Sequence, residues 1–212
     1  MKQFLLFIAL LSFVYSGEFR YSISPITPNI KHQMIKGNSY RQGCPVSLDK
    51  LRYIQLSYIG FDQKNHTGEL IVHKDVAQDI VDIFAKLYDA KYPIHQMRLV
   101  SHFQGNDWRS IEADNTSAFN CRNATHSHKF SKHAYGKAID INPIENPYIS
   151  RTGHISHKAS YRYKNRTPKS PNTPQNRAII TKDSLVYKLF IAHHWNWGGD
   201  WHYTKDYQHF QK

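Results

Sequence analysis

Residues 131–141 read SKHAYGKAIDI, and we predict a buried strand over residues 137–141. Asp140 stands among apolar residues there, so its carboxylate needs a cation, such as a metal ion or an Arg or Lys, or a strong hydrogen-bonding partner. His133 lies seven residues earlier, a spacing that puts the two side chains on opposite faces of a straight strand. They converge only if the chain bends, and Gly136 between them permits a bend because glycine adopts positive φ freely.

The surrounding sequence alternates between strand and helix patterns. Period-2 patterns and β-forming residues predict strands over 51–59, 69–73 and 97–101, with Gly60 and residues 66–68 as turn signals between the first two. Apolar residues at helical spacing predict helices over 75–92, 108–114 and 181–194. Strands and helices interleave without a regular βαβ rhythm, which favours the α+β class.

One domain is expected over residues 17–212, interrupted by a surface insertion at 143–180. That insertion is rich in proline, Asn, Ser, Arg and Lys, and it has no sustained periodicity. In the helix that follows it, the inward-facing residues are predicted to be Leu185, Leu189 and 191–192.

The composition is that of a globular protein with a basic surface. The 212 residues carry 28 Lys and Arg against 16 Asp and Glu, a formal net charge of +12. Wholesale disorder, collagen, coiled coil and a multi-span membrane protein are excluded. Such a surface suits nucleic acid, a membrane surface or an anionic cell-wall polymer. No basic-aromatic recognition motif is present, so we do not expect a nucleic-acid partner.

Residues 1–16 read MKQFLLFIALLSFVYS and are predicted to be a signal peptide, cleaved after Ser16. The apolar run is shorter than the roughly 20 residues of a membrane-spanning helix. An uncleaved anchor or a buried N-terminal helix is the alternative. In an exported protein the two cysteines, Cys44 and Cys121, favour a disulfide, with two buried free thiols as the alternative.

A second chemical cluster stands near the C-terminus, where Asp206 and His209 are three residues apart. We interpret this spacing as one side of a helical turn, although a surface pair has the same pattern. Catalytic zinc takes three protein ligands and keeps an open position for water. A nearby carboxylate that does not bind the metal can accept the proton of that water. His202 is the rival to His209 as third ligand.

The two clusters together resemble the zinc D-Ala-D-Ala carboxypeptidase family, which includes vancomycin-resistance D,D-peptidases and L-alanyl-D-glutamate peptidases of lysins. The family motif SxHxxGxAxD is matched by Ser131, His133, Gly136, Ala138 and Asp140, and its E/DxxH by Asp206 and His209. The similarity is closest to an extracellular carboxypeptidase-like branch. It implies a Hedgehog/DD-peptidase-like fold, with a small antiparallel sheet, flanking helices and a zinc site.

The resemblance also implies roles for individual residues. One Zn²⁺ per chain would be held by His133, Asp140 and His209, with Asp206 as the base. The D,D-dipeptidases place a transition-state arginine in a Tyr-Arg-Pro type sequence that is absent here, so Arg122 is its expected substitute and Arg98 the fallback. Ser131 is expected either to bind substrate or to cap the bend.

The implied function is a secreted or periplasmic zinc metallopeptidase that hydrolyses the stem peptides of peptidoglycan. D-Ala-D-Ala carboxypeptidase activity is the first expectation. Asp206 replaces the Glu of the D,D-dipeptidases, as in lysin-like members, so an L-alanyl-D-glutamate endopeptidase is an alternative. A non-catalytic, zinc-containing wall-binding module is another. We expect a monomer whose partner is a peptidoglycan peptide, without a stable membrane span.

Overall fold

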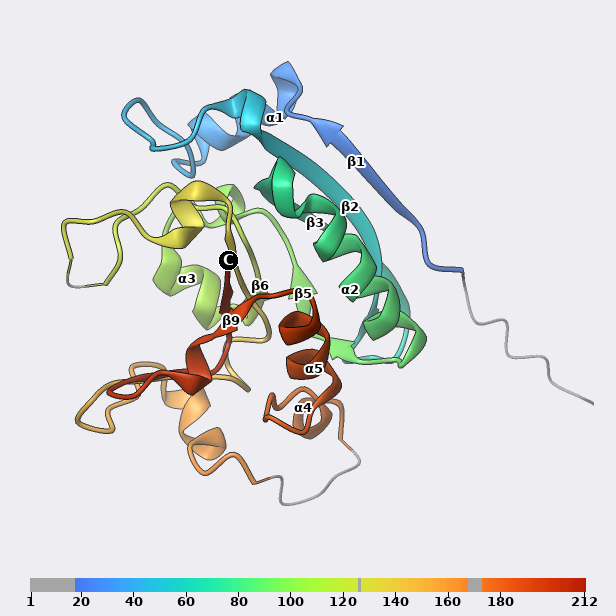
Figure 1. Cartoon of the computed structure of the whole chain (residues 1–212), viewed down its shortest axis with the longest axis vertical. Coiled ribbons are helices and arrows are strands. Elements are labelled where there is room, and N and C mark those ends of the chain that lie inside the picture. The colour runs from blue at the N-terminus through green and yellow to red at the C-terminus, as the bar shows by residue number, and fades with distance from the viewer. Residues whose placement is uncertain (1–17, 126, 168–172) are drawn as a thin grey trace, which may run out of the picture.

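The computed structural model describes residues 18–125, 127–167 and 173–212, so the predicted signal peptide lies outside the described residues. The fold mixes helices with small, mainly antiparallel sheets (Figure 1). The helices are α1 (Pro28–Lys36), α2 (Ala77–Asp89), α3 (Asp107–Glu112), α4 (Pro174–Arg177) and α5 (Leu185–Ala192). The strands are β1 (Tyr21–Pro25), β2 (Leu51–Gly60), β3 (Asn65–His73), β4 (Pro93–Ile94), β5 (Gln96–Met97), β6 (Asn115–Thr116), β7 (Ala138–Asp140), β8 (Tyr148–Ile149), β9 (Asn196–Trp197), β10 (Lys205–Asp206) and β11 (His209–Gln211). Within the described ranges, no helix combines the length and the apolar character needed to cross a bilayer.

The largest sheet has the order β1-β2-β3, and β4 pairs with β2 in parallel. Its long β2–β3 hairpin is curved, and α2 packs along one face of it (Figure 1). Alternate residues of β2, such as Ile54 and Leu56, are buried against α2 because successive side chains point to opposite faces of a strand. The predicted strand at 51–59 and helix at 75–92 are thereby confirmed, although the helix begins at Ala77 after a short 3-10 turn.

The hairpin turn lies earlier than the sequence predicted. Residues 66–68 belong to β3, and the turn consists of residues 61–64. Asp62 Oδ1 accepts a hydrogen bond from Lys64 N at 3.0 Å and contacts His66 Nε2 at 2.9 Å, while Gln63 takes a positive φ. The Asp62 side chain therefore stabilises the turn, and the backbone of His66 is the strand partner of Tyr58 across the hairpin.

The strand predicted at 97–101 is wrong beyond its first residue. Met97 pairs with Thr116 of β6, but the backbone of the next residue, Arg98, forms its hydrogen bonds with a side chain instead of with a strand. Asn115 Oδ1 accepts from Arg98 N, and Asn115 Nδ2 donates to Arg98 O, both at 2.9 Å. With its backbone groups satisfied in this way, the chain leaves the strand and forms a 3-10 helix over Val100–Phe103. The short helix predicted at 108–114 is confirmed as α3.

The predicted helix at 181–194 is confirmed as α5, but only part of the predicted inward face is right, because Leu189 packs against the core whereas Leu185 and residues 191–192 are exposed. Val186 and Phe190 are buried, whereas Leu185 and Ile191 are 40% and 38% exposed. Phe190 stacks on Phe210 of β11 with ring centroids 4.1 Å apart, and it belongs with Val186 to the main core cluster.

Residues 143–180, predicted as a surface insertion, contribute buried polar anchors. Asn146 is fully buried, and its Nδ2 donates to three backbone carbonyls, those of residues 141, 142 and 178. Its Oδ1 accepts from Ile180 N and from Arg166 Nη2. These hydrogen bonds hold both ends of the segment against the core. Because they are made by polar side chains, the sequence shows no hydrophobic periodicity that would have predicted them.

Several contacts join the two halves of the chain. Asp79 of α2 accepts hydrogen bonds from Trp195 Nε1 at 3.2 Å and from Lys212 Nζ at 2.7 Å.

Cys44 and Cys121 form a disulfide, with Cα atoms 5.8 Å apart, so the predicted pairing is confirmed. In the chain-entropy model a loop of this length contributes on the order of 4 kcal/mol.

A buried pair of carboxyl groups supports the loop after β7. Glu145 is 3% exposed and Asp114 6%, and Asp114 Oδ1 accepts from Ile144 N at 2.9 Å. Burial, followed by the charge of Asp114, raises the pKa of Glu145 to about 9. The Glu145 carboxyl group is therefore protonated at neutral pH.

This pair predicts a pH-dependent stability. Between the ordinary pKa of 4.5 and about 9, folded Glu145 keeps a proton that the unfolded chain has lost. The free energy of unfolding therefore falls as pH rises through this window, by up to about 1.4 kcal/mol per pH unit. Glu145→Gln, which resembles the protonated acid, should flatten the fall, as measured by urea unfolding across the window.

The exposed Glu112→Gln is the matched control and should keep the slope of the unchanged protein. If Glu145→Gln and Glu112→Gln lose stability with pH in parallel, Glu145 is ionised in the folded state and the prediction fails.

Candidate metal centre

The first imidazole of the site is carried by a capped turn. His133 lies in a 3-10 helix over Lys132–Tyr135, and Ser131 Oγ accepts a hydrogen bond from His133 N at 3.3 Å. Gly136 ends the turn with φ at 68°, as the sequence predicted. A Cβ at this glycine would come within 2.6 Å of His73 N, whose N–H donates to Gly136 O. The glycine therefore both bends the chain and allows the turn to pack tightly on β3.

Sheet register brings the other two side chains together. Asp140 ends β7, and His209 begins β11, and the two residues are direct partners in the antiparallel ladder. Cross-strand partners have neighbouring side chains on the same face of a sheet. The predicted helical turn carrying Asp206 and His209 is wrong. They lie on β10 and β11, on either side of the two-residue turn at Tyr207 and Gln208.

The structure places His133, Asp140 and His209 in one buried cluster. His133 Nε2 lies 3.2 Å from Asp140 Oδ2 and 3.2 Å from His209 Nδ1, and His209 Nδ1 lies 3.0 Å from Asp140 Oδ1. In tetrahedral zinc sites with bonds of about 2.0–2.2 Å, neighbouring donor atoms are roughly 3.3–3.5 Å apart. The donor set and its spacing therefore fit a zinc-sized ion with little rearrangement.

Two outer contacts orient the imidazoles for this purpose. His133 Nδ1 faces the carbonyl oxygen of Ala118 at 2.5 Å, and His209 Nε2 faces Gln211 Oε1 at 3.1 Å. Each acceptor holds the N–H of its imidazole, which leaves the lone pair of the other ring nitrogen for the cluster. Acceptors of this kind fix the tautomer and ring orientation of metal-binding histidines.

The cluster strongly favours positive charge at its centre. Burial alone would raise the pKa of Asp140, but the charges and hydrogen bonds of His133 and His209 hold it well below its usual range. Burial opposes a charged His209, yet the hydrogen bond and charge of Asp140 raise its pKa to about 9. A cation between these three side chains satisfies a carboxylate that is only 4% exposed.

Asp206 stands beside the cluster with a free oxygen. Its strand pairs with β8, where Asp206 is the partner of Tyr148, and Gly198 makes room for it, since a Cβ there would lie 2.5 Å from Asp206 O. Among the described residues, Asp206 Oδ1 is buried and has no hydrogen-bond partner. Burial outweighs the nearby imidazoles and raises the pKa of this carboxyl to about 7. Such a group can both accept and donate a proton near neutral pH.

Arg122 is the arginine whose charge reaches this carboxylate. It is one of the groups that lower the pKa of Asp206, and its Nη2 forms a salt bridge with Asp107 Oδ2 at 3.0 Å. Arg98 is exposed, and its guanidinium contacts His102 instead. His202 is also exposed and packs edge-on against Tyr203, outside the cluster.

Sequence reasoning missed the residues that position this site. Gln211 orients His209, Asp107 holds Arg122, and Gly198 gives Asp206 its place. The WNWGGDW and DYQHFQK stretches offered a signal in the paired glycines and in a glutamine two residues after a histidine. Alternate residues of a strand share a face, which puts Gln211 beside His209.

The C-terminal part of the chain, which carries the cluster, is similar to a known protein family. Residues 125–212 match the D-alanyl-D-alanine carboxypeptidase family. The family resemblance inferred from the two motifs is thereby confirmed, and the match contains both of them. It covers less than half of the chain and begins after Arg122, so the arginine is not part of the matched family segment. Neither the curated proteins nor the solved structures contain a match.

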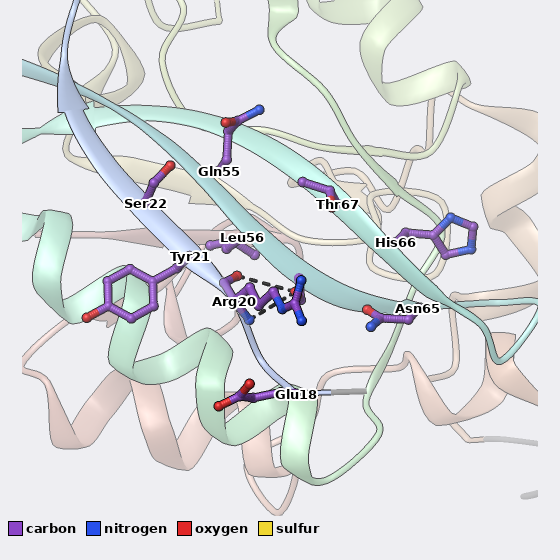
Figure 2. A pocket seen from close by; sticks show the side chains of 10 residues that line it. Glu18, Arg20, Tyr21, Ser22, Gln55, Leu56, Asn65, His66 and Thr67 are labelled. Carbon is purple, nitrogen blue, oxygen red and sulfur yellow. Dashed lines mark hydrogen bonds between the residues drawn. The ribbon is translucent and has the colours of Figure 1, made fainter. Parts of the chain in front are cut away.

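The match to this carboxypeptidase family indicates a metallopeptidase, and the buried cluster could hold its metal ion. The pocket in Figure 2 has a different position in the fold. It has a volume of about 630 Å³ and is lined by the segment that begins at Glu18 and by strands β2 and β3. None of the described residues that line it belongs to the metal cluster.

The outer contact of His209 predicts a metal-affinity defect. Gln211→Leu removes the acceptor that orients the imidazole, so zinc affinity should fall by about 10- to 100-fold. Competition with a chromogenic chelator measures this affinity. Gln33→Leu is the matched control, because Gln33 makes a comparable contact with His102 outside the cluster. Equal zinc affinity in the two variants would show that Gln211 does not orient a ligand.

Proposed function

We propose that this protein is a secreted zinc peptidase that hydrolyses the stem peptides of peptidoglycan, acting as a D-Ala-D-Ala carboxypeptidase. The observation that carries the proposal is the arrangement of two imidazoles and a carboxylate whose donor atoms converge, with the unpartnered Asp206 Oδ1 beside them. We also infer a fold of the Hedgehog/DD-peptidase type, supported by the family match and by this cluster.

His133, Asp140 and His209 would hold one zinc ion. When bound, zinc supplies a Lewis acid that lowers the pKa of water and polarises a peptide carbonyl. Asp206 accepts the proton of the attacking water on its free oxygen and later donates it to the departing amine. A carboxyl pKa of about 7 suits both steps, because the group changes protonation state near the working pH.

Arg122 supplies the second positive charge of the proposed site. Its guanidinium would balance the negative charge that develops on the carbonyl oxygen as the water attacks. The salt bridge to Asp107 limits the movement of the guanidinium, so that its charge is placed before substrate binds. Ser131 acts through the turn it caps, because its hydroxyl oxygen is bonded to the His133 backbone.

The substrate class and location follow from the surface and the N-terminus. Cleavage after Ser16 would remove one basic residue, Lys2, and the remaining net charge of +11 favours approach to an anionic cell wall. The proposed signal peptide at residues 1–16 would deliver the protein to that compartment, where the disulfide is stable. A stem peptide is the expected partner, and the protein is expected to act as a monomer.

Asp206→Asn tests the proposed proton carrier. The variant should keep one zinc ion per chain and lose about 10²- to 10⁴-fold in rate, since an amide cannot accept the proton. Mass spectrometry of a synthetic stem peptide ending in D-Ala-D-Ala measures the loss of one D-Ala. The exposed Asp183→Asn is the matched control and should retain full activity.

Other outcomes of the same assay separate the alternatives. Cleavage between L-Ala and D-Glu would replace the carboxypeptidase with an endopeptidase. A zinc-loaded chain that binds the peptide and cuts no bond would be a wall-binding module. An Asp206→Asn variant with unchanged rate would remove this residue from proton transfer.

A further inference from the structure

A basic pocket of about 540 Å³ lies against the turn at residues 131–137 that carries the first imidazole of the metal cluster. Its polar lining comes from that turn, from the segment before β2 and from the end of β3. The groups concerned are Ser47, Lys50, His73, Lys132, Tyr135 and Lys137. None of the described residues that line this pocket is acidic, so its walls offer mainly hydrogen-bond donors.

The lysines of this basic pocket are only weakly neutralised by their neighbours. Lys50 Nζ lies 3.7 Å from Asp49, and Lys137 Nζ lies 3.6 Å from Asp75. Both carboxylate side chains are more than half exposed, at 69% and 54%, so water screens these long ion pairs. Lys132 Nζ donates to a backbone oxygen of Lys212, the last residue of the sequence, at 3.5 Å, a long contact. The pocket therefore keeps a positive potential.

His73 adds an oriented imidazole. Its Nδ1 lies 3.2 Å from both Asp75 N and Asp75 Oδ2, so Asp75 fixes the orientation of the ring. Burial, and then the charges of Lys137, Lys74 and Lys50, outweigh Asp75 and lower the pKa of His73. Two of these lysines, Lys50 and Lys137, line the pocket together with His73.

We propose that the basic pocket binds a phosphate group. A phosphate carries up to two negative charges and several acceptor oxygens, so it can contact more than one ammonium group together with an imidazole or phenol donor. Lysine binds such groups as a point charge. A carboxylate offers a single charge and two oxygens, which match fewer of these donors. This site is separate from the metal cluster and does not depend on the proposed peptidase activity.

Free phosphate and a phosphodiester chain present the same chemistry to the pocket. Calorimetric titration of the full zinc-loaded protein with inorganic phosphate and, separately, with a short glycerol phosphate chain distinguishes them. Tighter binding of the chain assigns the site to a polymer, and tighter binding of inorganic phosphate assigns it to the free ion.

The decisive variant is Lys50→Gln/Lys132→Gln. It should weaken binding of the preferred ligand by roughly tenfold, because it removes two of the ammonium contacts. The control is Lys86→Gln/Lys188→Gln, which removes the same charge from exposed positions on α2 and α5 and should bind as the unchanged protein does. Thermal unfolding checks that both variants are folded, and Lys137→Gln provides a second pocket variant if the first is unstable.

Three results would overturn the proposal. The first is no measurable binding of either ligand. The second is an equal loss of affinity in the pocket and control variants, which would assign binding to overall surface charge. The third is full affinity in the pocket variant, which would place the phosphate elsewhere, including at the metal.

Discussion

The burial of one carboxylate, Asp140, is the constraint on which the C-terminal half of the molecule depends. At 4% exposure it cannot remain charged without positive partners, and two imidazoles meet it from different elements. One arrives through strand pairing and the other through a bent turn. The geometry that satisfies the carboxylate is also the geometry that a divalent ion requires, so stability and metal binding draw on the same contacts.

The neighbouring groups differ in how they are held, and the difference matches the roles we propose for them. The imidazoles are restrained by acceptors on their outer nitrogens, so their lone pairs have one direction. Asp206 has one buried oxygen without a partner among the described residues, and burial raises the pKa of its carboxyl group to about 7. A ligand group must be fixed, whereas a proton carrier must keep an oxygen available. The structure provides both conditions within a few residues of chain.

Much of this arrangement was predictable from local sequence signals, and the rest was not. The glycine between His133 and Asp140 indicated a bend, and periodicity located β2, α2 and α5. The errors arose where polar side chains replaced backbone partners or apolar patterns. The Asn115 side chain ended a strand by bonding to the backbone of Arg98, and the Asn146 side chain anchored a segment that has no hydrophobic periodicity. These bonds join residues far apart in sequence, so no window of neighbouring residues reveals them.

The ties between the two halves have a consequence for how this protein can evolve. Asp79 holds Trp195 and Lys212, and the backbone of His73 holds Gly136, so the family-matched segment rests on residues that precede it. Exchange of residues 125–212 with a relative by recombination would break these ties unless their partners changed as well. The two halves are therefore expected to descend together, with compensating substitutions at paired positions on either side of the junction.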